Sequence, residues 1–197
     1  MNTEDIKEEF ICICKEKIKR EGINDLLEWI CHSDFFIAPA SSKFHGSYAG
    51  GLAEHSINVY KCLKTLIKRY PHLNISEETI AICGLFHDLC KANFYKIGTR
   101  NVKDEKTGQW HKKEVYEIDE KFPIGHGEKS CIILQWFLRK LTTEELLAIR
   151  FHMGGFDSIV KGGDFSMSKA YETCSLAPML HLADMEATYL LEMVGEQ

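Results

Sequence analysis

The sequence lacks a long apolar run, an apolar segment at its start and an excess of basic residues. A membrane-spanning helix needs about 20 predominantly apolar residues, and a secretory leader carries an apolar core near the N-terminus. The chain begins instead with Met-Asn-Thr-Glu-Asp, which predicts a cytoplasmic protein with no membrane partner. Its formal net charge of -5 argues against a basic protein that coats duplex nucleic acid, although it permits a small basic patch inside a cleft.

The eight cysteines form no C-x-x-C pair and no zinc-ribbon spacing, so they do not indicate a zinc site of that kind. Most lie in apolar, helix-like stretches, where a free thiol behaves as a small hydrophobic side chain. Free thiols fit a reducing cytoplasm. The 197 residues contain no repeat, low-complexity tract or linker, and this length predicts a single domain over residues 1–197. Nothing in the sequence points to a particular oligomeric state.

Helix signals dominate the sequence. Thr142-x-x-Glu145 is a capping-box pattern, Ser76 is suited to cap a helix N-terminus, and residues 77–92 are apolar nearly all round, which predicts a central, buried helix. Helices are expected over about residues 3–21, 24–32, 52–69, 77–92, 125–140, 142–152 and, with an interruption near Pro178, 166–193. Turn-forming residues predict loops over residues 33–51 and 153–165.

Residues 93–120 change to a strand-like period. Phe94-Tyr-Lys-Ile and Glu114-Val-Tyr-Glu-Ile resemble short strands on either side of a polar turn at Lys106-Thr-Gly-Gln, which is the pattern of a β-hairpin. The predicted fold class is therefore all-α, a helical bundle with a small inserted hairpin. Residues 1–33 would supply N-terminal helices, residues 34–190 the core, and residues 93–120 the insert.

The dipeptide His87-Asp88 is the most informative feature that is present. Together with His55, His126, His152 and Asp184 it supplies four imidazoles and two carboxylates. Neutral imidazole suits manganese, iron, nickel or zinc, and a carboxylate can bridge two ions. A single histidine in a helix is more often packed or solvated than a ligand, but the joint pattern predicts a site for two divalent transition metals, built from facing helices.

Spacing predicts the roles of Asp88 and Lys91. Adjacent helical residues point about 100° apart, so His87 and Asp88 can flank a pocket in which the carboxylate spans two ions. Lys91 lies three residues after Asp88 and overhangs the same pocket. Two metals lower the pKa of a bound water and neutralise phosphate oxygens, and Lys91 would steady a phosphate. Asp88 and Lys91 are therefore the expected catalytic residues of a phosphoester hydrolase.

These residues resemble the HD-domain superfamily of metal-dependent phosphohydrolases. The resemblance covers about residues 34–190 and rests on Gly50-Gly51-Leu-Ala-Glu-His55-Ser, Leu85-Phe-His87-Asp88-Leu-Cys-Lys91, Gly125-His126-Gly and Leu180-His-Leu-Ala-Asp184. It implies an HD-domain helical bundle in which His55, His87, Asp88 and Asp184 hold one metal, and Asp88, His126 and His152 hold the second. The motifs look most like the HD domain of bacterial 3′–5′ exoribonucleases, without room for the OB-fold that those nucleases carry.

Two other functions fit the same residues. The six ligands also resemble those of mixed-valent diiron oxygenases of this superfamily, such as myo-inositol oxygenase, so ligand identity does not separate hydrolysis from oxygen activation. A non-catalytic nucleotide-binding module is the third alternative. The hydrolase is favoured because the segments around His55 and His126 look closer to the phosphohydrolase branch. Its substrate would be a phosphorylated small molecule, a nucleotide or a short single-stranded nucleic acid.

Several further residues are weaker candidates. His45, in the loop before the first ligand, would touch the substrate or cap a turn of its loop. Lys96 and Arg100, on the hairpin, would clamp a phosphate or simply face solvent. Hairpin aromatic residues would stack on a base or pack within the strands. His181, three residues before Asp184, would be a structural or solvated histidine or would support a ligand.

Overall fold

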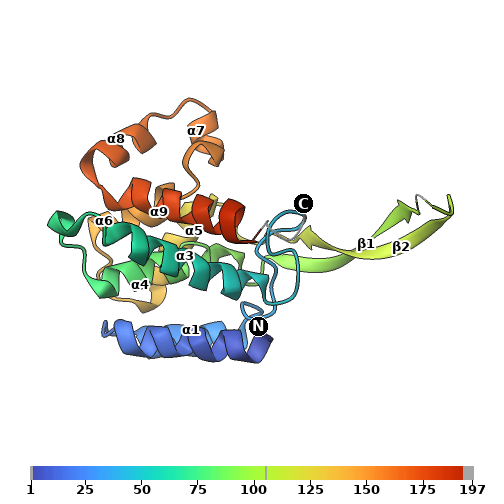
Figure 1. The fold of residues 1–197 in the computed structure, drawn as a ribbon, viewed down its shortest axis with the longest axis horizontal. Coiled ribbons are helices and arrows are strands. Elements are labelled where there is room, and N and C mark those ends of the chain that lie inside the picture. The colour runs from blue at the N-terminus through green and yellow to red at the C-terminus, as the bar shows by residue number, and fades with distance from the viewer. Residues whose placement is uncertain (1, 105, 193–197) are drawn as a thin grey trace.

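The computed structural model describes residues 2–104 and 106–192, which form a mostly helical body and one antiparallel hairpin (Figure 1). The α-helices are α1 (Thr3–Lys17), α2 (Ile23–His32), α3 (Gly51–Ile67), α4 (Glu77–Phe86), α5 (His126–Phe137), α6 (Thr143–Phe151), α7 (Ser158–Lys161), α8 (Ser166–Thr173) and α9 (Leu176–Glu186). Short 3₁₀ turns span Pro71–Leu73, Leu89–Lys91 and Gly154–Phe156, and a π-helical turn, Ala187–Glu192, follows α9. The predicted helical fold with an inserted hairpin is confirmed.

Local capping explains where several helices begin. The side chain of Asn2 accepts a hydrogen bond from the backbone N–H of Asp5 at the start of α1. Ser76 caps α4 as predicted. Thr142 and Glu145 make both bonds of the predicted capping box at the start of α6. Each cap satisfies a backbone donor that would otherwise lack a partner.

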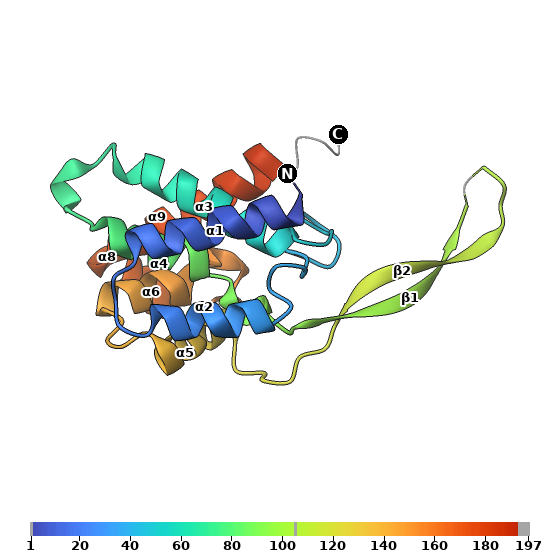
Figure 2. The ribbon, with the colours of Figure 1, turned by 90° about the horizontal axis from the view of Figure 1, so that it is seen from below.

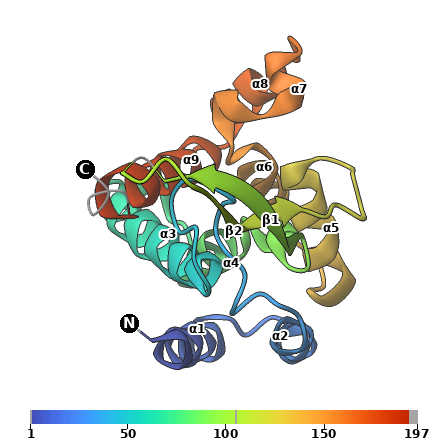
Figure 3. The ribbon, with the colours of Figure 1, turned by 90° about the vertical axis from the view of Figure 1, so that its right-hand side faces the viewer.

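The core lies where α3, α4, α6 and α9 pack together, with α1 laid across α3 and α4 (Figures 1 and 3). Every residue of α4 from Ile80 to Phe86 is buried, as its apolar sequence predicts. Phe10 of α1 packs against Phe35, Phe36 and Phe86, with ring centroids 5.1–5.7 Å apart. This packing holds the C-terminal end of α4 at the centre of the molecule.

The hairpin projects from the helical body (Figure 2). Strands β1 (Tyr95–Lys103) and β2 (Trp110–Ile118) pair in register from Tyr95 with Ile118 to Lys103 with Trp110. At the turn, the carboxylate of Asp104 accepts hydrogen bonds from the backbone N–H groups of Lys106 and Thr107. The hairpin predicted over residues 93–120 is confirmed.

Two predicted helices end earlier than expected. Helix α1 stops at Lys17 rather than near residue 21, because the chain is drawn into tertiary contacts. The backbone N–H of Lys19 donates to Glu78, and the Arg20 guanidinium pairs with both oxygens of the buried Glu145, at 2.6 and 3.0 Å. The helix predicted over 125–140 ends at Phe137. The contacts of Lys19 and Arg20 outweigh the local helix preference at the end of α1.

The central helix also ends early. The helix predicted over residues 77–92 stops at Phe86, and a 3₁₀ turn, Leu89–Lys91, follows it. Asp88 lies between the two with φ -103° and ψ 20°, the sparsely populated region that turns and active-site residues often occupy. His87 keeps helical dihedral angles, φ -55° and ψ -36°, so helical geometry ends at His87 and Asp88 lies outside it.

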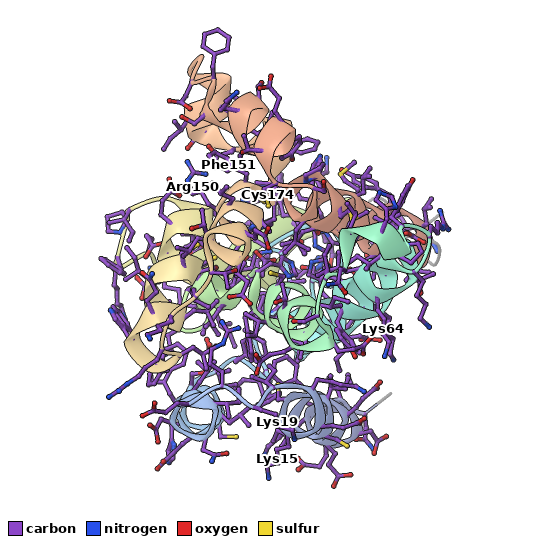
Figure 4. The ribbon with its side chains drawn as sticks, turned by 90° about the vertical axis from the view of Figure 1, so that its left-hand side faces the viewer. Lys15, Lys19, Lys64, Arg150, Phe151 and Cys174 are labelled. Atoms are coloured by element: carbon purple, nitrogen blue, oxygen red, sulfur yellow. The ribbon has the colours of Figure 1, made fainter. Side chains whose placement is uncertain are left out.

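The expected loop over residues 153–165 contains short helical turns. Asp157 caps the single-turn α7 by accepting from the N–H groups of Ile159 and Val160. It also accepts from Arg150 at 2.9 Å. Helices α7 and α8 protrude from the body (Figure 3), and Arg150 and Phe151 lie at the base of this protrusion (Figure 4). The Asp157 carboxylate thus ties the protruding segment to α6.

The expected interruption near Pro178 occurs at Cys174 and Ser175, between α8 and α9. Pro178 itself lies in the first turn of α9, where its missing N–H costs no helical hydrogen bond. No helix within residues 2–104 and 106–192 is long and apolar enough to cross a membrane.

Candidate metal centre

The six predicted ligands converge on one place in the fold. His55 lies near the start of α3, His126 begins α5, and Asp184 lies in α9. His87 and His152 directly follow α4 and α6, and Asp88 follows His87. Ends of packed helices bring these side chains together, as expected for a metal site within a bundle. Their role as ligands stays a prediction.

The donor atoms fall into overlapping groups that could each hold a metal ion. Three groups consist of predicted ligands: His55, His87 and Asp88; His87, His152 and Asp184; and Asp88, His126 and His152. A fourth joins His55 to His45 and Glu192. Within each group the donor atoms lie within 4.8 Å of one another. Groups that share members describe adjacent positions rather than separate sites.

Asp88 is the residue that faces both sides of the cluster. Its Oδ1 lies 2.6 Å from Nε2 of His126 and 3.4 Å from Nε2 of His152. Its Oδ2 lies 3.6 Å from Nε2 of His87 and 3.8 Å from Nε2 of His55. A carboxylate with one oxygen toward each pair of imidazoles has the geometry of a bridging ligand.

Hydrogen bonds through Nδ1 set the direction in which two of the histidines face. Nδ1 of His87 lies 2.9 Å from the carbonyl oxygen of Gly84, and Nδ1 of His152 lies 2.7 Å from that of Ile149. A carbonyl oxygen only accepts, so Nδ1 carries the proton in both rings. Both Nε2 atoms therefore turn toward the cluster with the character of metal ligands.

Imidazole nitrogens of the cluster are buried in positions that a bound cation would satisfy. Within the described part of the chain, Nε2 of His152 is buried and has no hydrogen-bond partner, which is costly for a polar atom. Nε2 of His87 lies 3.3 Å from Nε2 of His55, so a proton on His55 or a cation must lie between these two nitrogens. Imidazole nitrogens and carboxylate oxygens together suit a divalent transition metal, so the residues present fit such an ion.

The pKa shifts of the clustered histidines and carboxylates show how burial and neighbouring charges act on each group. Burial would lower the pKa of His55, but its contacts with Asp184 and Glu192 raise it to about 10. Burial would raise the pKa of Asp88, yet the neighbouring lysine and histidines hold it well below its ordinary value. The carboxylates are thus ionised, and burial lowers the pKa of His87 to about 3, so this ring is neutral. Neutral imidazole beside ionised carboxylate is the state that binds metal; His87 already has it, and His55 reaches it when a metal displaces its second proton.

Lys91 lies at the edge of the cluster, in a pocket of about 640 Å³. Its ammonium donates to Oδ2 of Asp88 and to the carbonyl oxygen of Ala40, both at 2.6 Å. Burial would lower the pKa of Lys91, but Asp88 raises it above its ordinary value, so the ammonium is charged. An ammonium has three N–H donors, and one remains for a group in the pocket. Lys91 and Asp88 therefore line the same pocket, and the catalytic role of Lys91 stays a prediction.

The four substrate-binding candidates divide between the pocket and the hairpin. His45 and Lys91 line the pocket, and Nε2 of His45 is buried without a hydrogen-bond partner among the described residues. Burial lowers the pKa of His45 to about 4, so its ring is neutral. Lys96 and Arg100 lie exposed on β1 and do not line this pocket. Their phosphate-binding role stays a prediction, whereas Tyr95 at the base of the hairpin does line the pocket.

Sequence reasoning missed two residues beside His55. Both carboxylate oxygens of Glu192 lie 3.1 Å from Nδ1 of His55, and the amide of Asn58 donates to Glu192 at 3.0 Å. Asn58 lies one helical turn after His55 in α3, and this spacing was the sequence signal that could have indicated a polar neighbour of His55. His181 was a weaker candidate for the support of a ligand. Its Nδ1 lies 2.7 Å from the carbonyl oxygen of His152, and the role stays a prediction.

Comparison with known protein families agrees with this site. The sequence profile described as HD domain matches residues 52–186, more than half of the chain. The chain therefore belongs to the HD-domain family, whose members are generally metal-dependent phosphohydrolases. The matched segment contains all six predicted ligands and ends before Glu192. No curated protein and no solved structure matched the chain in the corresponding searches.

Proposed function

We propose that this chain is a phosphohydrolase that cleaves a phosphoester of a nucleotide or of a short single-stranded nucleic acid at a binuclear metal site. The observation that carries the proposal is the position of Asp88, whose two oxygens face different pairs of histidines. A carboxylate whose two oxygens face different pairs of imidazoles can reach two adjacent ions. The substrate class follows the resemblance to the HD domain of bacterial 3′–5′ exoribonucleases.

The six residues would divide between two ions. His55, His87, Asp88 and Asp184 would hold one, and Asp88, His126 and His152 would hold the other. Manganese, iron, nickel and zinc all suit this mixture of imidazole and carboxylate. When bound, such a pair of ions lowers the pKa of a coordinated water and neutralises the charge of phosphate oxygens.

The chain itself supplies charge and shape around the reacting phosphate. Lys91 has one free N–H donor toward the pocket, and its charge favours an anionic substrate. Its bond to the Ala40 carbonyl fixes the ammonium, so little reorganisation is needed when a phosphate arrives. His45 presents an unpartnered Nε2 from the facing loop. The pocket volume lies within the usual range for small-molecule sites, about 300–1,000 Å³.

A substrate screen tests this function. The manganese-loaded protein is incubated with nucleotides, cyclic dinucleotides and short RNA and DNA oligomers, and products are separated by chromatography. We expect cleavage of at least one phosphoester, which chelation abolishes and added metal restores. His152→Ala should abolish it, whereas His72→Ala, which changes an exposed histidine remote from the cluster in sequence and outside the pocket, should not.

Two outcomes would contradict the proposal. If the fully loaded protein cleaves no member of the panel, hydrolysis of these substrates is excluded. If it instead consumes oxygen with a small polyol or phosphonate and shows a mixed-valent iron signal by electron paramagnetic resonance, the diiron oxygenase is the correct alternative.

A further inference from the structure

A carboxylate outside the family match lies directly behind one of the candidate ligands. Glu192 is the last residue of the π-helical turn that follows α9, and its side chain is only 6% exposed. Both of its oxygens lie 3.1 Å from Nδ1 of His55. The amide of Asn58, one turn further along α3, donates to Oε1 of Glu192 at 3.0 Å. The carboxylate is thus held in place from a second direction.

This contact determines which nitrogen of His55 carries the proton. An ionised carboxylate only accepts, so Nδ1 of His55 must donate to Glu192. When a metal displaces the proton of Nε2, this nitrogen offers its lone pair, and it lies 3.3 Å from Oδ1 of Asp184 and 3.3 Å from Nε2 of His87. A carboxylate behind a ligating imidazole fixes its tautomer and orientation and raises its basicity. Glu192 therefore directs the free nitrogen of His55 to the cluster.

Neighbouring histidines are oriented differently. His87 and His152 donate through Nδ1 to carbonyl oxygens three residues before them, in their own helices. In the middle of a helix this carbonyl is already engaged, and His55 lies within α3, four residues after its start. Its Nδ1 partner must therefore come from elsewhere in the fold, and Glu192 provides it from 137 residues away in the sequence.

The π-helical turn makes this contact possible. In an α-helix with 3.6 residues per turn, residues eight positions apart lie about 80° apart around the axis. Asp184 and Glu192 are eight positions apart, yet they contact opposite nitrogens of the same ring, Nε2 and Nδ1 of His55. A π turn contains more residues per turn and is frequent at functional sites. The π turn therefore places Glu192 on the side of the helix that faces the imidazole ring of His55.

We propose that Glu192 is a positioning residue for His55, which selects Nε2 as the metal ligand and thereby sets the affinity of the metal position that His55 serves. The inference rests on the proposed metal centre. Glu192 acts through His55 and is not itself a ligand. Asn58 supports it by fixing the carboxylate.

Zinc binding to the full chain tests the proposal, because zinc is diamagnetic and permits nuclear magnetic resonance. Affinity is measured by competition with a chelator in wild type, Glu192→Ala, Glu192→Gln and the control Glu186→Gln, which removes a carboxylate from the same segment. We expect Glu192→Ala to weaken one of two zinc positions by about 10–100-fold. Glu192→Gln should be impaired less, since its amide oxygen still accepts from Nδ1, and Glu186→Gln should match wild type.

A spectroscopic signature separates positioning from general support. In protein with ¹⁵N-labelled histidine, wild type should show His55 protonated at Nδ1 and metal-bound at Nε2, with the resonances identified by comparison with His55→Asn. In Glu192→Ala the His55 pattern should change, while the metal-bound resonances of His126 and His152 persist. Circular dichroism verifies that each variant is folded.

Each contrary result has a distinct meaning. If wild type binds zinc at two positions and Glu192→Ala is unchanged in affinity and in the His55 resonances, the positioning role is wrong while the proposed function stands. An equal loss at both positions would also overturn it, because that result indicates a general structural role. If wild type binds no metal, the proposed function and this inference fall together.

Discussion

Asp88→Asn is the substitution that should affect both metal positions at once. The amide has nearly the same shape as the carboxylate but loses the charge and one acceptor oxygen. Because Oδ1 faces His126 and His152 while Oδ2 faces the other two imidazoles, the substitution would remove the oxygen ligand of one ion and the negative charge that serves both. Asp184→Asn should affect only the position that His55 serves, since Oδ1 of Asp184 lies 3.3 Å from His55. Elemental analysis should therefore find two ions per chain in wild type, one in Asp184→Asn and none in Asp88→Asn.

The same difference should appear in thermal stability. Metal that binds only the folded state adds about 2.7 kcal/mol per site at a free concentration 100 times Kd, so two sites add about 5 kcal/mol. For a protein of this size about 2–4 °C accompanies each kcal/mol, so metal should raise the Tm of wild type by about 10–20 °C. Asp184→Asn should keep about half of this rise, and Asp88→Asn almost none. If Asp88→Asn keeps the full rise and both ions, the bridging role of Asp88 is wrong.

Three further predictions concern other residues. Lys91→Ala should keep both metals and lose about 10²–10³-fold in turnover; an unchanged turnover number would remove the lysine from the mechanism. Arg20→Ala leaves the buried carboxylate of Glu145 without its ion-pair partner. It should lower the free energy of unfolding, measured in urea, by about 3–5 kcal/mol. The control Arg139→Ala, which removes an exposed ion pair, should lower it by under about 1 kcal/mol. Burial alone would raise the pKa of Asp157, but the backbone N–H groups that it caps and a neighbouring arginine hold it below its ordinary value. Its stabilising contribution is therefore present above the unfolded pKa of about 3.9 and is lost as pH falls through the lower folded value; Asp157→Asn should flatten that part of the stability curve, and equal slopes in both proteins would contradict this.

Local sequence signals were sufficient for much of the fold. The capping box at Thr142 and the cap at Ser76 mark helix starts because their hydrogen bonds lie within four residues. The hairpin was predictable because its turn and alternation are also local. The end of the central helix was not, since Asp88 leaves helical geometry to meet partners that lie far away in the sequence.

The candidate site shows the same division. Five of the six predicted ligands lie in motifs that resemble a known family, and His152 does not; the family profile spans all six, and their role as ligands stays a prediction. Glu192 was not predictable, because it lies beyond that match and its partner is 137 residues away. Nothing in the residues around it signals a π turn, and only the assembled fold brings it to His55.

The distribution of the site along the chain has a consequence during protein synthesis. The ribosome makes the chain from the N-terminus, so residues 55–152 are complete before Asp184 and Glu192 exist. A nascent chain that has released α3 to α6 therefore carries Asp88 and the four imidazoles without the carboxylates of Asp184 and Glu192. The proposed activity should begin abruptly, when the α9 segment docks, rather than grow with chain length. Prematurely terminated products would then be catalytically silent, however much of the helical body they had already formed.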